Sequence, residues 1–162
     1  MRTEAGQGES DKQSAVILIS ANSFWNIRNF RVGLIDALAE QGWRVIIAAP
    51  GVDQEWAAER RAEAVGLSID RSGTNPVRDF ALIANYHRLI LRCRPEFFLG
   101  FTAKPNIYGS LAARFSDVVC LPNVSGLGTA FINPGPVSAL VGALYRLAFA
   151  KCPVVFFQNG DD

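Results

Sequence analysis

The chain has 162 residues, of which 49% are hydrophobic and 19% are charged, and its formal net charge is +1. This length accommodates one domain with a substantial core, and this composition excludes an intrinsically disordered chain and a surface that coats nucleic acid. The three cysteines, Cys93, Cys120 and Cys152, are widely spaced in apolar stretches, which argues against a disulfide framework and a zinc site. They are typical of core thiols in a cytosolic protein.

The first 14 residues are polar, contain glycine and lack the apolar run of a signal peptide. We expect them to form a disordered tail, followed by a single domain at 15–162. In that domain, apolar runs typical of buried parallel strands alternate with stretches typical of helices. The predicted strands are 15–20, 43–50, 67–69, 96–100, 118–122 and 153–157, and the predicted helices are 30–41, 54–66, 77–93, 105–115 and 137–151.

This alternation predicts an α/β fold: an open, mostly parallel, Rossmann-like sheet with helices on both faces. Two helices have a recognisable apolar stripe. The residues in these stripes are Leu34, Ile35 and Leu38 in the first, and Phe80, Ile83, Ala84, Leu89 and Leu91 in the third. Ligands of such sheets bind at the carboxyl ends of the strands, so we expect the functional residues in the loops 20–31, 100–106, 123–136 and 158–162.

The loop 123–136, "NVSGLGTAFINPGP", looks like a glycine loop for a phosphate. A dinucleotide fingerprint, however, lies between the first strand and the first helix, and here Phe131 stands where the third glycine is required. No P-loop sequence occurs either. The single histidine, His87, falls inside a predicted helix, and the one carboxylate pair in these loops is Asp161 and Asp162. The sequence therefore shows no complete active site.

Five stretches, in this order along the chain, resemble the N-terminal half of family-4-like glycosyltransferases: 29–45, 102–114, 123–131, 144–151 and 154–162. The similarity is greatest to enzymes that extend undecaprenyl-diphosphate-linked saccharides. The resemblance implies the GT-B architecture, in which an N-terminal Rossmann-like domain receives the acceptor and a C-terminal one holds the nucleotide-sugar. It also implies retention of the anomeric configuration, no metal, and no cofactor besides the nucleotide-sugar co-substrate.

The family's carboxylate pair lies in the donor-binding domain, which this sequence lacks, so we expect the chain alone to be inactive. The resemblance implies the acceptor-binding half of an enzyme that transfers a hexosyl or N-acetylhexosaminyl group to a lipid-linked or polysaccharide acceptor in bacterial envelope glycan synthesis. Such an enzyme is cytoplasmic and bound peripherally at the inner face of the membrane. The alternatives are a stand-alone Rossmann-type binding module and an inactive truncated product.

The resemblance assigns acceptor binding to a set of residues in the strand-end loops: Asn26, Arg31, Lys104, Asn106, Gly126, Gly128 and Phe131. Asn159 is assigned to the interdomain cleft, and the catalytic base stays unassigned, because Phe101, Thr102 and Ala103 stand where some relatives have a histidine. Arg31 and Lys104 are expected to hold an anionic diphosphate, whereas Arg28 is expected to be a solvated rim residue. The glycines of the loop 123–136 are expected to let the backbone turn beside the acceptor.

Four residues keep two interpretations each. Asn106 either reads a sugar hydroxyl or caps its helix, and Tyr108 either reads a hydroxyl or packs in the core. Phe24 and Trp25 form either a stacking wall for a sugar or an apolar plug below the loop. The segment 118–145, which has no charged residue, is either a flank that rests on a membrane, with Arg146 and Lys151 at its end, or a helix buried against the sheet and a partner domain.

Overall fold

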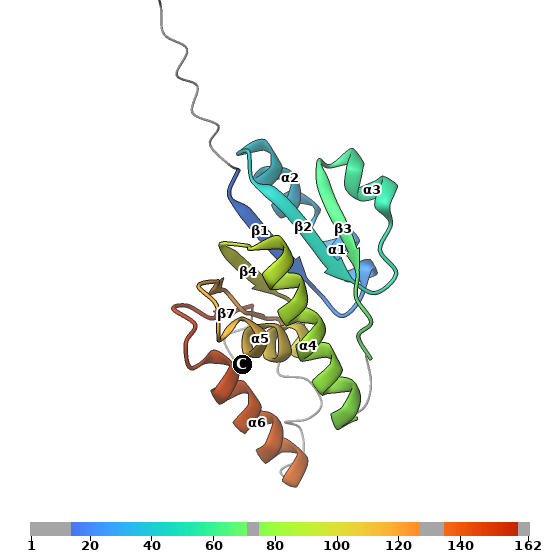
Figure 1. The fold of residues 1–162 in the computed structure, drawn as a ribbon. Coiled ribbons are helices and arrows are strands. Elements are labelled where there is room, and N and C mark those ends of the chain that lie inside the picture. Colours follow the sequence, from blue (N-terminus) through green and yellow to red (C-terminus); the bar gives the residue numbers. More distant parts are fainter. Residues whose placement is uncertain (1–13, 71–74, 127–134, 159–162) are drawn as a thin grey trace, which may run out of the picture.

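The fold is known from a computed structural model that describes residues 14–70, 75–126 and 135–158 (Figure 1). The expected tail, apart from its last residue, lies outside the described residues. The elements in chain order are β1 (Val16–Ser20), α1 (Phe24–Phe30), α2 (Val32–Glu40), β2 (Arg44–Ala49), α3 (Gln54–Glu59), β3 (Ala62–Gly66), α4 (Pro76–Cys93), β4 (Phe97–Gly100), the π-helical turn η1 (Pro105–Gly109), α5 (Ser110–Ala113), β5 (Val119–Cys120), β6 (Asn123–Val124), α6 (Pro136–Phe149) and β7 (Phe156–Phe157).

Five strands form a parallel sheet in the order β3-β2-β1-β4-β5. The central strand, β1, pairs through Ile19 with Ile47 of β2 on one side and with Leu99 of β4 on the other. All the strands therefore end at one edge of the sheet, and the loops that follow them share that edge. The prediction of an open, parallel, Rossmann-like sheet is confirmed.

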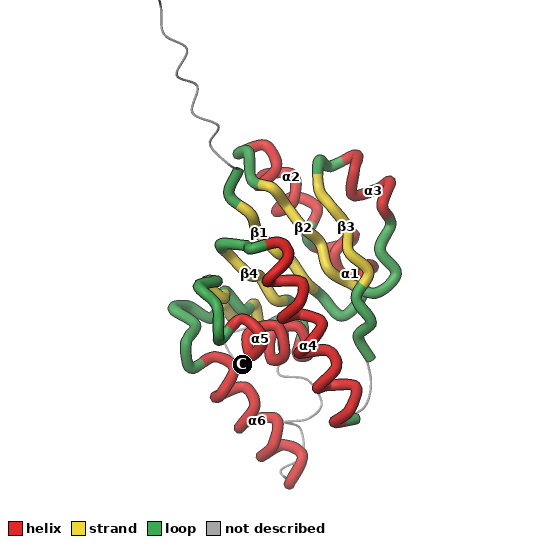
Figure 2. Tube along the Cα trace, viewed as in Figure 1, coloured by secondary structure: helices red, strands yellow, loops and turns green. Residues whose placement is uncertain are grey.

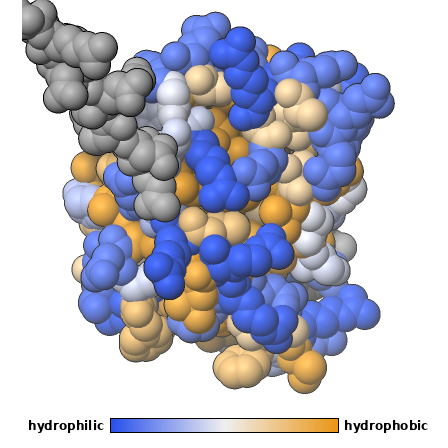
Figure 3. All heavy atoms as spheres, turned by 45° about the horizontal axis from the view of Figure 1, so that its top comes forward, coloured by the Kyte–Doolittle hydropathy of each residue, from blue (hydrophilic) through white to orange (hydrophobic). Residues whose placement is uncertain are grey.

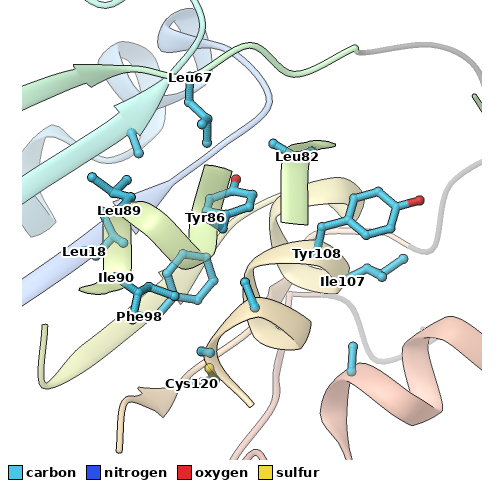
Figure 4. Packing of buried hydrophobic residues seen from close by; sticks show 14 of the residues in the cluster. Leu18, Leu67, Leu82, Tyr86, Leu89, Ile90, Phe98, Ile107, Tyr108 and Cys120 are labelled. Carbon is cyan, nitrogen blue, oxygen red and sulfur yellow. The ribbon is translucent and has the colours of Figure 1, made fainter. Parts of the chain in front are cut away.

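Helices cover both faces of the sheet (Figures 1 and 2). Because side chains alternate along a strand, Leu18 and Ile46 pack with α4, η1, α5 and α6, whereas Ile19 and Ile47 pack with α1, α2 and α3. Figure 4 shows the first of these two clusters, in which the rings of Tyr86 and Phe98 meet edge to face at 5.7 Å. The fold is thus a three-layer arrangement with one apolar cluster on each side of the sheet.

Two predicted elements at the β3 edge of the sheet are wrong. The predicted helix 54–66 ends at Glu59, and the third strand is Ala62–Gly66, not 67–69. Alanine, glutamate and arginine favour a helix there, but pairing of Ala62–Gly66 with β2 outweighs that propensity. The loop predicted after β1 contains α1, whose first turn is capped by the Ser23 hydroxyl accepting from the Asn26 N–H at 3.3 Å.

The apolar stripe predicted for α4 is also partly wrong. Phe80 is 74% exposed and Leu91 57% exposed, while the stripe predicted for α2 is confirmed by burial of Ile35. The buried residues of α4 are Asp79, Leu82, Tyr86, Leu89 and Ile90. This spacing follows one face of a helix, and the prediction missed it because Asp79 is charged and Tyr86 polar at its tip.

The last predicted strand lies outside the five-stranded sheet. Phe156–Phe157 (β7) pairs in parallel with Asn123–Val124 (β6), and a single bridge from Phe101 to Asn123 links this small sheet to the end of β4. The interruption at Leu121 and Pro122 separates β5 from β6, since proline cannot donate to a ladder. The second sheet therefore extends the carboxyl edge of the first.

The molecular surface is mixed in character. Figure 3 shows hydrophilic residues over most of the face that comes forward when the top of Figure 1 is turned toward the viewer, with hydrophobic residues in patches between them. The helix α6 packs against η1 and α5, buries Tyr145 and Ala148, and leaves Leu140 and Leu147 at least half exposed. Within the described residues, no helix combines the length and the apolar character needed to span a bilayer.

Candidate functional site

The carboxyl ends of β1 and β4 bring the first two predicted loops into contact. The Phe101 N–H donates to the Ser20 carbonyl at 2.8 Å, and the Asn22 N–H donates to the Thr102 hydroxyl oxygen at 3.1 Å. Thr102 adopts a φ of 71°, a backbone conformation that is uncommon for a β-branched residue. The contact with the loop after β1 offsets the cost of this conformation, and the two loops form one continuous wall.

A buried hydrogen-bond chain supports this wall from inside the sheet. The Ser20 hydroxyl donates to the Ala48 carbonyl at 2.7 Å and accepts from the Tyr86 hydroxyl at 2.7 Å. Burial raises the pKa of Tyr86 above its ordinary value, while the bond to Ser20 acts in the opposite direction. These two hydrogen bonds join β1, β2 and α4 immediately below the loops and so fix the strand ends relative to one another.

Arg31 lies at this edge, between the end of α1 and the start of α2. Its guanidinium stacks over the Phe101 ring, 4.0 Å from the ring centroid, and Nη1 donates to the Phe30 carbonyl at 3.2 Å. Its Nε is buried and has no hydrogen-bond partner among the described residues. Burial lowers the pKa of Arg31, but a guanidinium remains protonated at any physiological pH. Arg31 thus presents an oriented positive charge at the strand ends.

Asn26 lies in α1, five residues before this arginine. Its Oδ1 is buried and, within the described part of the chain, accepts no hydrogen bond. Of the two aromatic residues beside it, Phe24 packs edge to face on Trp56 at 5.2 Å, whereas Trp25 is largely exposed and meets Phe30 at 5.5 Å. Phe24 therefore fits the interpretation as an apolar plug below the loop. Trp25 instead exposes its ring at the surface.

Lys104 does not present a free charge. Its Nζ lies 2.7 Å from Oδ1 of Asp79 in α4, and the two side chains are only 17% and 13% exposed. Tyr108 lies near the same carboxylate. Burial, followed by the interaction with Asp79 and its negative charge, raises the pKa of Tyr108. Figure 4 shows the Tyr108 hydroxyl pointing away from the apolar cluster.

Sequence reasoning missed Asp79. The signal was available, because Asp79 shares one helical face with Leu82, Tyr86 and Ile90, and a carboxylate on a buried face needs a partner. The arrangement joins α4 to the start of η1 through an ion pair and a phenol.

Among the predicted site residues that the structure describes, Asn106 is the most deeply buried, at 1% exposed. Its Nδ2 donates to the Asn123 carbonyl at 2.9 Å, so it joins η1 to β6 and does not cap a helix. Its Oδ1 lies against Gly100, where an added Cβ would come within 2.5 Å of that oxygen. Oδ1 accepts no hydrogen bond within the described residues. Asn106 holds the backbone of the strand-end loop from behind.

The remaining predicted residues are only partly described. Gly126 has a φ of 149°, a conformation that favours glycine, as a tight turn after β6 requires. Gly128, Phe131 and Asn159 lie outside the described residues. His87 is half-buried, with Nδ1 3.3 Å from the Ala112 carbonyl oxygen, as expected for a structural histidine. The described residues contain no group of three side chains suited to hold a metal ion.

The chain matches a known protein family and is similar in fold to solved structures. Residues 16–159 match the family described as glycosyl transferase 4-like. No curated protein matches the chain. Among solved structures, MurG of Acinetobacter baumannii is similar with a TM-score of 0.56 and 15% identity, covering 89% of this chain and 41% of that one.

Two further structures show the range of enzymes with this fold. A putative UDP-N-acetylglucosamine 2-epimerase from Listeria monocytogenes has a TM-score of 0.62 and 15% identity, over 89% of this chain and 38% of that one. The glycosyltransferase SnogD from Streptomyces nogalater has a TM-score of 0.51 and 25% identity, over 86% and 39%. The chain thus spans about two fifths of the length of each structure.

These structural similarities establish a half-molecule fold shared by glycosyltransferases and sugar-nucleotide epimerases. The family match is more specific, because it runs from β1 through β7 and includes the loops 20–31, 100–106 and 123–136 of the carboxyl edge. By this match, the chain belongs to the glycosyl transferase 4-like family.

Proposed function

We propose that the chain is the acceptor-binding half of a retaining glycosyltransferase that uses a nucleotide-sugar donor. The observation that carries this proposal is the family match over residues 16–159. The share of about two fifths that the chain covers in MurG and SnogD supports a division of labour, with the donor held by a second Rossmann-like domain. The group transferred is a hexosyl or N-acetylhexosaminyl group, and neither a metal nor a further cofactor takes part.

The acceptor is an anion held at Arg31. Stacking on Phe101 fixes the plane of the guanidinium, and no carboxylate among the described residues pairs with it, so its charge remains available to a diphosphate. Lys104 was expected to share that anion, but Asp79 balances its charge. Arg31 is therefore the principal anion contact of this proposal, with the Asn26 Oδ1 nearby as an acceptor for a sugar hydroxyl.

The diphosphate belongs to a polyprenyl-linked saccharide. Exposed apolar side chains border the carboxyl edge on three helices, and each is more than half exposed: Trp25, Phe30, Val77, Phe80 and Leu140. Figure 1 shows the first turns of α4 and α6 projecting beyond the sheet at this same end. We call these five residues the apolar rim. A prenyl chain or the membrane surface around it would cover them, which makes the enzyme peripheral to the inner face of the cytoplasmic membrane, in envelope glycan synthesis.

Calorimetry on the full chain tests the acceptor assignment. The ligands are a short-chain prenyl-diphosphate N-acetylhexosamine and UDP-N-acetylglucosamine. We expect the prenyl diphosphate to bind, and Arg31→Gln to weaken its binding by about tenfold or more, since a charge-assisted hydrogen bond contributes about 1.5–3 kcal/mol. Arg28→Gln, at an exposed position on the neighbouring α1, is the matched control and should leave the affinity within about twofold.

Two results would contradict this assignment. Equal binding by the Arg31→Gln and Arg28→Gln variants would show that Arg31 is not the anion contact. Tight binding of the nucleotide-sugar and none of the prenyl diphosphate would favour the second candidate, a stand-alone nucleotide-binding module, for which the fold shared with a UDP-N-acetylglucosamine 2-epimerase is the supporting observation.

A further inference from the structure

Cys120 and Cys152, although far apart in the sequence, lie together in the structure. Cys120 ends β5 and is buried at the edge of the cluster shown in Figure 4, while Cys152 follows α6 and is half-buried against the same cluster. The two thiols are close enough for each to shift the pKa of the other. Their separation in the sequence argued against a disulfide, but chain separation does not measure distance once α6 has packed onto η1 and α5.

Cys120 and Cys152 both line one pocket of about 330 Å³. Ser110 lines the same pocket. This pocket involves none of the residues assigned to the acceptor, and its walls come from α5, β5 and the end of α6. The two thiols are therefore a separate chemical feature that small molecules can reach from solvent through Cys152.

The charges around the pocket favour an anionic ligand. Arg114 and Lys151 line it, and their side chains donate only to backbone carbonyls: Arg114 to Leu147 at 2.8 Å, and Lys151 to Arg114 at 3.4 Å. Neither forms an ion pair within the described residues. Asp117 is the one acidic side chain among the lining residues. The net charge at the rim of the pocket is positive.

The two thiols are unequal. The interaction with the Cys120 thiol, the largest influence, lowers the pKa of Cys152, and the interaction with Cys152 together with burial raises the pKa of Cys120. Cys152 is also the more exposed of the two. A thiolate at an exposed position beside cations is the nucleophile in thiol–disulfide exchange, and a buried thiol is the resolving partner.

We propose that Cys152 and Cys120 form a dithiol modification site for a small anionic disulfide such as oxidised glutathione. The Cys152 thiolate attacks one sulfur of the disulfide, forming a mixed disulfide and releasing one thiolate, which takes a proton from water. Cys120 then loses its proton to solvent and attacks the Cys152 sulfur, which expels the second small thiol. The two protein thiols are oxidised to one disulfide, and the small disulfide is reduced to two thiols.

Mass spectrometry after exposure to oxidised glutathione tests this proposal. We expect a single glutathione adduct to form first and then convert to a form lighter than the reduced chain by two hydrogen atoms, with peptides of Cys120 and Cys152 joined. Cys93 is the internal control, because it is half-buried like Cys152 but is not among the residues that line the pocket. Its modification should be at least about tenfold slower.

Two variants separate the steps. Cys120→Ala should stop at the adduct on Cys152, and Cys152→Ala should abolish both products, whereas Cys93→Ala should change neither. Because Cys120 is buried, the folding of each variant is checked by comparing its circular dichroism with that of the unaltered chain. The peptide map of the unaltered chain tests the proposal even if a variant fails to fold. Absence of the joined peptides, or an adduct on Cys93 formed as fast as that on Cys152, would overturn the proposal.

Discussion

At the scale of single residues, the ion pair between Lys104 and Asp79 changes how the predicted site is interpreted. A lysine in a strand-end loop suits an anionic ligand, but here a carboxylate from α4 pairs with the ammonium group at the start of η1. The positive charge is used within the fold. Arg31 differs, because within the described part of the chain its guanidinium donates to a backbone carbonyl and stacks on an aromatic ring, neither of which neutralises its charge.

Substitution of Lys104 by methionine should lower the free energy of unfolding by about 2–4 kcal/mol, since it leaves the Asp79 carboxylate buried without its cation. Urea denaturation at neutral pH measures the effect. Arg44→Met is the matched control, because the pair of Arg44 and Glu63 is about half exposed and its loss should cost less than about 1 kcal/mol. Equal losses in the two variants would show that the Lys104 pair is no more than a surface contact.

At the scale of elements, the π-helical turn η1 sets the path of the chain behind the carboxyl edge. Gly109 at its end lies so close to β4 that an added Cβ would come within 2.2 Å of the Phe98 ring. Phe98 is itself almost wholly buried and packs edge to face on Tyr86 of α4, so it has no room to move aside. The close approach of η1 to the sheet also places Asn106 against Gly100 and Asn123.

Gly109→Ala should therefore reduce the free energy of unfolding by about 1–3 kcal/mol through overpacking, even though alanine is the better helix former. Gly33→Ala is the matched control in α2, where an added Cβ meets no atom within 4 Å. That variant should be neutral or more stable by up to about 1 kcal/mol. Thermal unfolding of the two variants provides the comparison, and a Gly109→Ala protein as stable as Gly33→Ala would refute the close contact.

At the scale of the whole molecule, the apolar rim and Arg31 occupy one end, where the strands finish and the first turns of α4 and α6 project (Figure 1). The opposite end also has an exposed aromatic residue, Phe115, in the turn between α5 and β5. If the end with the apolar rim faces the membrane, the opposite end does not. Exposed apolar side chains should then contribute to membrane binding in the apolar rim but not at Phe115.

Flotation with anionic liposomes measures this difference. We expect the full chain to co-float, and Trp25→Ser and Phe80→Ser each to reduce the bound fraction, with a partition coefficient lower by about tenfold, as burial of a large apolar side chain contributes about 1.5–3 kcal/mol. Phe115→Ser should leave binding unchanged. Failure of the unaltered chain to co-float would remove the membrane contact while leaving the acceptor assignment at Arg31 to calorimetry.

The sequence by itself determined the class of fold and the edge where function is expected. The apolar residues within Val16–Ser20 and Arg44–Ala49 form continuous runs that are buried on both faces of the sheet, as strands covered by helices on both sides require. The apolar stripe of α2 is also readable from the sequence, because its spacing follows the period of the helix and depends only on residues of the same segment. The ordered stretches that resemble the family were likewise readable along the chain, and the match over 16–159 confirms them.

Only the tertiary structure decided which side chains meet. The strand Ala62–Gly66 forms because β2 offers it an edge, the ammonium of Lys104 is balanced by an aspartate from α4, and Cys120 meets Cys152 through the packing of α6. Each of these contacts joins residues that are distant along the chain, so its free energy depends on the packing of whole elements and leaves no periodic pattern in the sequence. Propensity and spacing describe neighbours along the chain, whereas the chemistry of this carboxyl edge depends on neighbours in space.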